Sequence, residues 1–141
     1  MGIRSLRSII GTGNPVTATG ATTVLEAALL MKKTGKGALL VVDGSRLIGI
    51  FTERDALFRV LAVGRDPAST RLGEVMTPQP LTIQADQPFL QALRIMHKGG
   101  FRHLPVVEFD RPLGIVSARD ALDDDLYDLR ADLAQREDAL E

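Results

Sequence analysis

The sequence predicts an α+β fold in which two β-α-β-β-α repeats pack about a pseudo-two-fold axis. Three observations predict it: one phrase occurs twice, the segments before each copy match without a gap, and both copies carry helix and hairpin signals in the same order. The phrase is GIFTERDAL at Gly49–Leu57 and GIVSARDAL at Gly114–Leu122. Because neither repeat is large enough to bury much surface alone, we expect the two repeats to share a core.

The two copies are separated by 65 positions throughout their length. The matching pairs include Pro15 and Pro80, Thr17 and Thr82, Leu25 and Leu90, Met31 and Met96, Gly35 and Gly100, and Asp55 and Asp120. A lead-in with similar apolar spacing precedes each copy, with Leu6, Ile9 and Ile10 in the first and Leu72, Val75 and Met76 in the second. We therefore divide the chain into a first repeat with its lead-in (6–66), a second repeat (72–130) and an acidic C-terminal tail (131–141).

Within each repeat, the elements follow from local signals. A brief extended segment, PVTA or PLTI, precedes a helix. Thr23 and Glu26 have the spacing of a capping box, and Pro88 lies in the first turn of the second helix, where a missing amide donor costs nothing. Gly35 and Gly99-Gly100 are typical of helix ends. The apolar runs that flank DGSR and EFDRP predict hairpins, and a final helix is expected to begin in each repeated phrase.

The composition excludes several classes of function. The chain has 17 Lys and Arg against 18 Asp and Glu, so its formal net charge of −1 gives no field that attracts nucleic acid or an anionic membrane. No apolar run approaches the roughly 20 residues that span a bilayer. Five Phe, one Tyr and no Trp are too few for a base-stacking platform. The absence of cysteine excludes disulfides and thiolate chemistry, and we expect a cytoplasmic protein.

The order strand–helix–strand–strand–helix, with GIFTERD in the first copy and RHLPVV…GIVSARD in the second, closely resembles a tandem CBS-domain pair, also called a Bateman module. The resemblance extends from Leu6 to Leu126. It implies a regulatory module that binds an adenine nucleotide of the AMP, ADP or ATP type, with or without Mg²⁺, in the clefts between the repeats. The alternatives are a module that binds S-adenosylmethionine or NAD, and a structural or protein-interaction module whose clefts are empty or vestigial.

The Ser/Thr-x-x-Asp part of the phrase has two interpretations. In Thr52-x-x-Asp55 and Ser117-x-x-Asp120, the hydroxyl and the carboxylate can each cap a free amide at a helix start. The same carboxylate can also accept the two hydroxyls of a ribose, and the free amides of a helix start favour a phosphate. In members of the family the Asp binds ribose and the Ser or Thr lies beside the phosphate. The resemblance therefore implies that capping and ligand binding both apply here.

The resemblance also implies cationic groups that face the ligand, because a guanidinium can bind phosphate in bidentate fashion. Arg54 and Arg119 precede the two aspartates, and Arg102 and His103 open the second hairpin. The arrangement carried over from the family gives one site of Thr52, Asp55, His103 and Arg119, and a second site of Ser117, Asp120, Arg102 and Arg54. The counterparts of Arg102 and His103 in the first repeat are the uncharged Gly37-Ala38, so we expect the two sites to differ.

For the adenine base, the resemblance implies backbone contacts near Thr17 and Thr82 and an apolar wall. The residues of that wall are Leu39, Leu104 and Pro105. Ordinary core packing is an alternative use of each leucine. ATP, ADP, AMP and S-adenosylmethionine all remain open as ligands.

The sequence offers neither a catalytic group nor a metal site. Nucleophilic catalysis needs a base beside the nucleophile, and the histidines are His97 and His103. These two lie six positions apart across a helix end, which differs from the i, i+4 spacing of a helical zinc site. The sequence contains no Walker loop and no dinucleotide fingerprint. We expect a protein without catalytic activity that reports ligand occupancy to an unidentified regulated protein.

The last part of the chain predicts a helix with an apolar stripe. Leu122, Leu126, Leu129 and Leu133 are spaced by four, three and four residues, and aspartates surround them. The stripe either continues across the core of the second repeat or contacts another protomer. Because CBS pairs commonly form flat dimers, the resemblance implies a homodimer. Its candidate contacts are Leu57, Leu61, Leu122 and Leu126.

Overall fold

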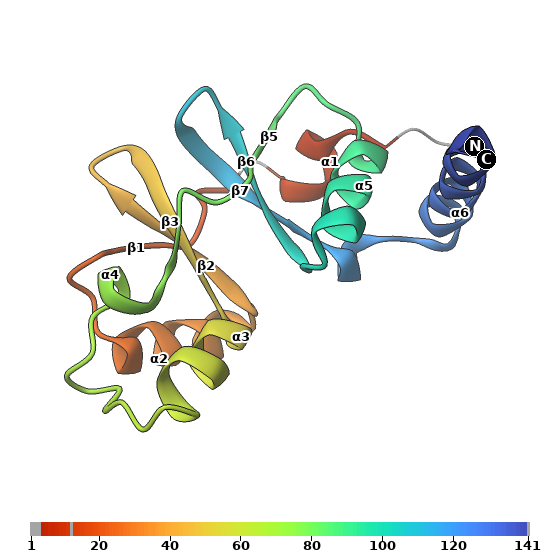
Figure 1. Cartoon of the computed structure of the whole chain (residues 1–141). Helices are drawn as coiled ribbons and strands as arrows, with labels where there is room; N and C mark the ends of the chain where they lie inside the picture. Colours follow the sequence, from red (N-terminus) through yellow and green to blue (C-terminus); the bar gives the residue numbers. More distant parts are fainter. Residues whose placement is uncertain (1–3, 12, 141) are drawn as a thin grey trace.

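The computed structural model describes residues 4–11 and 13–140. It confirms the predicted α+β class, because each repeat forms a small sheet with helices beside it (Figure 1). The first repeat contains β1 (Thr17–Thr19), α2 (Val24–Thr34), β2 (Ala38–Asp43), β3 (Arg46–Thr52), α3 (Glu53–Asp55) and the π-helix η1 (Ala56–Leu61). The second contains β5 (Ile83–Gln84), α5 (Phe89–Gly99), β6 (His103–Glu108), β7 (Arg111–Ser117), the 3-10 turn η2 (Ala118–Asp120) and α6 (Asp123–Leu140). The lead-ins form α1 (Leu6–Ile10) and α4 (Leu72–Val75), and β4 (Thr77–Pro78) follows α4.

The two sheets repeat the same topology. β1 is parallel to β2, which is antiparallel to β3, and β5, β6 and β7 pair in the same way. β4 adds a fourth strand on the outer side of β3. The register shifts between Val41 and Val42 in the first hairpin and between Val106 and Val107 in the second. Because these irregularities also lie 65 positions apart, the duplication extends to the details of strand pairing.

The predicted helix signals are confirmed at the residues that carry them. The hydroxyl of Thr23 accepts the N–H of Glu26 at 3.1 Å, and a carboxylate oxygen of Glu26 accepts the N–H of Thr23 at 3.2 Å. Gly35 and Gly100 end α2 and α5 in the left-handed region, at φ of 69° and 71°. Glycine adopts this conformation at no steric cost. Pro88 differs from the prediction by one position, because it is the N-cap of α5 and precedes the first turn in which it was expected.

The lead-ins pack against the opposite repeats. Leu6 of α1 is buried in the core of the second repeat, whereas Leu72 and Val75 of α4 are buried in the core of the first. Two equivalent backbone hydrogen bonds fix this exchange, from Phe89 N–H to the carbonyl of Arg4 (2.9 Å) and from Val24 N–H to the carbonyl of Thr70 (2.8 Å). Figure 1 shows α1 beside β7 and α5, which lie far from α1 in the sequence. The repeats are therefore interlocked.

The ends of the two repeats differ. The prediction that a final helix begins in each repeated phrase is confirmed for the first phrase and wrong for the second. The first phrase continues from α3 directly into η1 as far as Leu61. The second phrase makes only the single turn η2, because Ala121 is extended (φ −70°, ψ 132°), and α6 begins afterwards in a new direction. Asp125 accepts the N–H of Leu122 at 2.9 Å and pairs with Arg4 at 2.8 Å, which stabilises the new helix start.

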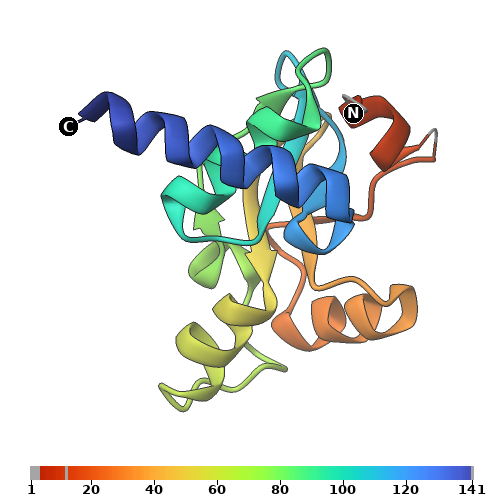
Figure 2. The same ribbon diagram turned by 90° about the vertical axis from the view of Figure 1, so that its right-hand side faces the viewer.

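Helix α6 packs against α5 and extends past the rest of the molecule at its C-terminal end (Figure 2). The guanidinium of Arg94 on α5 binds both carboxylate oxygens of Asp132 at 2.8 Å, and Leu129 packs on the core of the second repeat. The described part of the predicted acidic tail, residues 131–140, is thus a continuation of α6. None of the described helices combines the length and apolar character needed to cross a membrane.

Candidate functional site

Two clefts contain the repeated Ser/Thr-x-x-Asp phrases. The first cleft has a volume of about 590 Å³ and contains Thr52 and Asp55. Other residues that line the first cleft are Ile50, Glu53, Arg54, Phe58, Arg59, Thr77, Pro80, Leu81, Phe101, Arg102, His103 and Pro105. The second cleft has a volume of about 430 Å³ and contains Ser117 and Asp120. Other residues that line the second cleft are Pro15, Val16, Lys36, Gly37, Ala38, His103 and Arg119. Each cleft takes side chains from both repeats.

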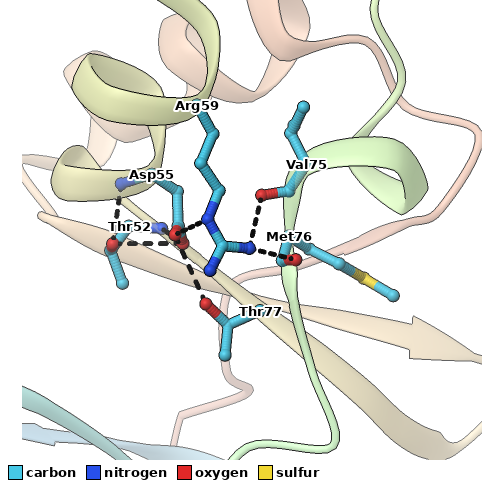
Figure 3. Close-up of polar contacts among 6 residues, drawn as sticks. All are labelled: Thr52, Asp55, Arg59, Val75, Met76 and Thr77. Atoms are coloured by element: carbon cyan, nitrogen blue, oxygen red, sulfur yellow. Dashed lines mark hydrogen bonds and ion pairs between the residues drawn. The ribbon is translucent and has the colours of Figure 1, made fainter.

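In the first cleft, the carboxylate of Asp55 already has several partners (Figure 3). Its Oδ2 accepts the backbone N–H of Thr52 at 3.0 Å and the hydroxyl of Thr52 at 3.2 Å. Its Oδ1 accepts the hydroxyl of Thr77 at 3.3 Å. Asp55 is only 6% exposed, so these contacts replace most of its hydration. Asp55 is therefore a helix cap and also a bond between the first repeat and β4.

Arg59 completes the environment of Asp55 from one helical turn further on. Its Nε lies 3.5 Å from Oδ1 of Asp55, the i, i+4 arrangement of an ion pair. Its Nη1 donates to the carbonyls of Met76 at 3.0 Å and Val75 at 3.5 Å (Figure 3). Arg59 thereby neutralises Asp55 and binds the segment that leads from α4 into β4. A ribose that reached this carboxylate would have to displace Thr77 or Arg59.

The rest of the first cleft is cationic and apolar. The guanidinium of Arg54 lies 5.4 Å from the ring centre of Phe58, within cation–π range, and Arg102 and His103 enter from the start of β6. The apolar side chains are contributed by Ile50, Phe58, Pro80, Leu81, Phe101 and Pro105. This cleft can bind an anionic group beside an apolar or aromatic ring.

In the second cleft, the equivalent carboxylate has fewer partners. Oδ2 of Asp120 accepts the N–H of Ser117 at 2.8 Å, which is the cap predicted from the sequence. Within the part of the chain that the structure describes, this is the single hydrogen bond that the carboxylate accepts. Lys36, Arg119 and His103 line the same cleft. The second cleft thus presents a carboxylate oxygen able to accept hydroxyl groups, with cationic groups nearby.

His103 lines both clefts and forms the partition between them. Burial lowers the pKa of its imidazole below the ordinary value; the carboxylate of Glu53 opposes this shift, and the positive charges of Arg102 and Arg119 add to it. Glycine at position 37 makes the close approach possible, because a Cβ there would lie 2.5 Å from Oε1 of Glu53 and 3.2 Å from Nε2 of His103. The lowered pKa leaves His103 neutral at pH 7, on the walls of both clefts.

The structure groups the arginines differently from the two predicted sites. His103 lies with Thr52 and Asp55 as predicted, but Arg54 and Arg102 also line that first cleft, whereas Arg119 lines the second. The physical reason is local. Arg54 and Arg119 each share a helical turn with the aspartate that follows, so each enters the cleft of its own phrase, and Arg102 accompanies His103 at the start of β6.

The predicted adenine wall is only partly in place. Thr17 and Thr82 are exposed, and the cleft walls contain their neighbours Pro15 and Val16 in the second cleft and Pro80 and Leu81 in the first. Leu39 and Leu104 are fully buried in the two cores, as the packing alternative requires. Pro105 does line the first cleft.

Three residues of the sites escaped the sequence prediction: Lys36, Arg59 and Thr77. Each stands opposite a different residue type in the other repeat, with Phe101 opposite Lys36 and Asp124 opposite Arg59. Aligning the lead-ins places Gly11 opposite Thr77. These three residues could have been found in the sequence as positions where the two repeats differ. The prediction instead used the positions where the repeats agree.

Comparison with known proteins agrees with this geometry. The model of the CBS domain family matches residues 6–62 and 72–126. The chain is 42% identical over 97 residues to the Meiotically up-regulated gene 70 protein of Schizosaccharomyces pombe, and the match covers 68% of this chain and 13% of that relative. The chain therefore spans only a small part of that protein.

Two solved structures have the same fold. A CBS domain protein from Pyrobaculum aerophilum, complexed with AMP, superposes with a TM-score of 0.80 at 22% identity, over 90% of this chain and 98% of that one. A CBS domain pair in complex with 5′-methylthioadenosine and S-adenosyl-L-methionine gives a TM-score of 0.72 at 29% identity, over 82% of this chain and 94% of that one. The first of these likenesses concerns the fold alone.

Proposed function

The chain belongs to the CBS domain family as a CBS pair, and on that premise we propose that it binds an adenine nucleotide between its repeats and has no catalytic activity of its own. Binding would favour one arrangement of the interlocked repeats, and a regulated protein would respond to that arrangement. Such regulation requires only that the ligand bind two conformations with different affinity. We further propose that the module acts in the cytoplasm and associates with a second copy of itself.

The observation that carries this proposal is the second cleft. Asp120 can accept ribose hydroxyls because its carboxylate is not surrounded as that of Asp55 is. Ser117 lies beside it, and Lys36 and Arg119 supply positive charge for a phosphate. A related CBS pair is solved with 5′-methylthioadenosine and S-adenosyl-L-methionine, and a protein of the same fold with AMP, which supports an adenosine-containing ligand.

The first cleft is proposed as the weaker site. Thr52, Asp55, Arg54, Arg102 and His103 are its candidate ligand groups. Occupation would cost the contacts that Asp55 makes with Thr77 and Arg59. We therefore expect one nucleotide per chain at moderate concentration and a second only at higher concentration.

The test is a thermal-shift and calorimetric titration with AMP, ADP and ATP, the last with and without Mg²⁺, and with S-adenosylmethionine and NAD. A ligand that binds only the folded state stabilises it by about 2.7 kcal/mol at one hundred times its Kd, so the rise in Tm is measurable. We expect an adenine nucleotide to stabilise the wild type. Asp120→Ala should lose most of that increment, and the Asp55→Ala, Asp120→Ala double variant should lose all of it.

The Asp110→Ala variant is the matched control, because Asp110 lies in the β6–β7 hairpin turn outside both clefts. An increment that survives intact in the double variant would show that the repeated aspartates are only caps. Release of phosphate from ATP at about 1 s⁻¹, an ordinary enzyme rate, would overturn the proposal of a non-enzyme.

A second function has an observation in its favour. The saturated carboxylate of Asp55 is what a structural or protein-interaction module with a vestigial first cleft would have. If the whole panel of ligands leaves the Tm of the wild type unchanged, this second function replaces the first.

A further inference from the structure

The first cleft has two phenyl rings that the second cleft lacks. Phe58 and Phe101 line the first cleft, and their counterparts 65 positions away in the repeat are Asp123 and Lys36. Among the residues that the structure describes, no phenylalanine or tyrosine lines the second cleft. The two clefts therefore offer different surfaces to a ligand, although both contain the same repeated phrase.

The carboxylate of Asp55 makes the first cleft a poor site for a ribose. Its Oδ2 accepts the N–H and the hydroxyl of Thr52, and its Oδ1 accepts the hydroxyl of Thr77 and pairs with Arg59 (Figure 3). These partners use the roughly four acceptor positions of a carboxylate. A ligand without the adjacent hydroxyls of a ribose leaves all of these contacts in place. The first cleft therefore favours a ligand that has no ribose.

Two guanidiniums of the first cleft have no carboxylate partner. Arg54 and Arg102 are both exposed, and neither takes part in an ion pair within the described part of the chain. The guanidinium of Arg54 lies 5.4 Å from the ring centre of Phe58, a cation–π contact that favours this position. Because a guanidinium can bind a carboxylate through two parallel N–H···O bonds, an anionic group fits this part of the cleft.

The balance of charge favours a ligand with a single negative charge. The charged side chains that line the first cleft are three arginines and two acids: Arg54, Arg59, Arg102, Glu53 and Asp55. One positive charge is left over, since the imidazole of His103 is neutral at pH 7. A monoanion neutralises that charge. A phosphate dianion would leave an extra negative charge in the same cleft as Glu53, which repels it.

The rest of the first cleft is apolar and partly uncovered. Phe58 is 55% exposed and Leu81 is 62% exposed, and Phe101, Pro80 and Pro105 complete the apolar walls. A volume of about 590 Å³ lies in the range of small-molecule sites, which are mostly apolar with a few polar groups. Aromatic rings pack on phenylalanine in offset or edge-to-face arrangements. A planar ring therefore fits beside the two guanidiniums.

We propose that the first cleft binds an aromatic monocarboxylate that has no ribose. The carboxylate binds the guanidiniums of Arg54 and Arg102. The ring packs among Phe58, Phe101 and Leu81. Such a ligand is a second input to the module, beside the nucleotide proposed for the second cleft. The inference goes beyond the proposed function and does not require it, because none of these five residues lines the second cleft.

Calorimetry with 2-naphthoate on the full chain tests the ligand class. We expect one molecule to bind per chain with a Kd below about 1 mM, which a ligand of this size reaches in a formed pocket. Three analogues each change one feature: 2-naphthalenemethanol is neutral, cyclohexanecarboxylate has no aromatic ring, and 2-naphthyl phosphate is mostly a dianion at pH 7.5. Each should bind more weakly than 2-naphthoate. If 2-naphthoate does not bind saturably, or if any analogue binds as tightly, the assignment of the ligand class is wrong.

Three arginine variants locate the site. Arg54→Gln and Arg102→Gln each remove a guanidinium from the first cleft and should weaken 2-naphthoate about tenfold. Arg119→Gln is the matched control, because Arg119 is the repeat counterpart of Arg54 and lines the second cleft. It should leave the affinity for 2-naphthoate unchanged. All three side chains are exposed, so the fold should survive, and far-ultraviolet circular dichroism verifies this. Unchanged affinity in both first-cleft variants, or a larger loss in Arg119→Gln, would overturn the proposal.

Titrations with AMP keep this proposal apart from the nucleotide proposal. Asp120→Ala should lose AMP binding at the second cleft and retain its affinity for 2-naphthoate. With AMP held at the concentration that fills one site of the wild type, one molecule of 2-naphthoate should still bind. Displacement of 2-naphthoate by that AMP would place both ligands in one cleft and overturn the proposal of a second ligand class. If 2-naphthoate binds as expected and AMP does not bind at all, only the nucleotide proposal fails.

Discussion

The two clefts start from the same phrase, yet one carboxylate is enclosed and the other is available. Asp55 and Asp120 both accept the N–H of the Thr or Ser three positions earlier, so both are caps. Asp55 also holds Thr77 and Arg59, and through Arg59 the segment after α4. The repeat therefore preserves the local cap, and the residues around it decide whether the carboxylate can bind a ligand.

The walls of the clefts differ for a related reason. The first residue of β6, His103, and the two residues before it, Phe101 and Arg102, enter the first cleft. Their counterparts Lys36, Gly37 and Ala38 enter the second. The first cleft gains an aromatic ring and charge, whereas the second gains space and a lysine. Different side chains at equivalent positions of a duplicated fold can thus give two different sites.

The largest expected effect is on folding stability. Asp55→Ala removes a cap, a hydrogen bond to Thr77 and an ion pair from a buried site, so we expect a loss of about 2–3 kcal/mol in the free energy of unfolding. Asp120→Ala removes one cap, worth about 1 kcal/mol. Chemical denaturation without ligand measures both. Equal losses would mean that Thr77 and Arg59 contribute nothing at Asp55.

The next effect is on nucleotide affinity in the second cleft. Arg119→Ala removes a guanidinium from the cleft that contains Asp120, and we expect AMP to bind about tenfold more weakly, or about 1.4 kcal/mol. Arg102→Ala, in the other cleft, is the matched control and should change this affinity less than twofold. Calorimetry at the tighter site measures both. A larger loss of affinity for Arg102→Ala than for Arg119→Ala would support the arrangement that the family resemblance implied, with Arg102 in the site of Asp120.

A smaller effect in free energy is expected from opening the first cleft. Arg59→Ala removes the ion pair from Oδ1 of Asp55 and leaves the Thr77 hydroxyl as the contact that a ribose must displace, so we expect the number of AMP molecules bound per chain to rise from one to two at a fixed, moderate concentration. Because Arg59 is half exposed, its loss should cost less than about 1 kcal/mol of stability. Arg7→Ala removes a comparable exposed ion pair, with Glu108, and should leave the stoichiometry at one. An unchanged stoichiometry for Arg59→Ala would show that the ion pair does not close this cleft.

The comparison also shows which features a sequence can predict. The caps at Thr23 and Thr52 and the helix end at Gly35 depend on residues within four positions, so their patterns were sufficient. The break at Ala121 depends on Arg4, whose guanidinium contacts Asp125 and the carbonyl of Asp120 from the other end of the chain. The exchange of α1 and α4 between the repeats likewise arises from packing between distant segments. Such contacts leave no local pattern.

The site was predictable to the same extent. The phrase correctly placed Thr52, Asp55, Ser117 and Asp120 at the clefts, because a strand that ends at a helix start fixes where those side chains lie. The ion pair of Asp55 with Arg59 had a readable signal in its i, i+4 spacing and in the unlike residue Asp124 opposite Arg59. The sequence could not assign Arg54, Arg102 and Arg119 to one cleft or the other, since their positions depend on how the two repeats face one another.

The smallest expected effect is the dependence of AMP affinity on pH, through His103 between the clefts. Its pKa is lowered from the ordinary 6.5, chiefly by burial, so the free protein carries a neutral imidazole at pH 7. A phosphate beside it favours the charged form and raises this pKa. Affinity for AMP should therefore increase a few-fold as the pH falls from 7.5 to 5.5.

The ligand-free protein should show the opposite trend, and this makes the origin of the effect testable. Between the lowered pKa of His103 and 6.5, the unfolded chain binds more protons than the native state, so the free energy of unfolding falls as the pH drops through that window. His103→Gln should remove this part of both slopes. The phosphate of AMP titrates in the same range and contributes equally for every variant, so the difference between wild type and His103→Gln isolates the imidazole. If wild type and His103→Gln do not differ at any pH, protonation of His103 does not affect the binding of AMP.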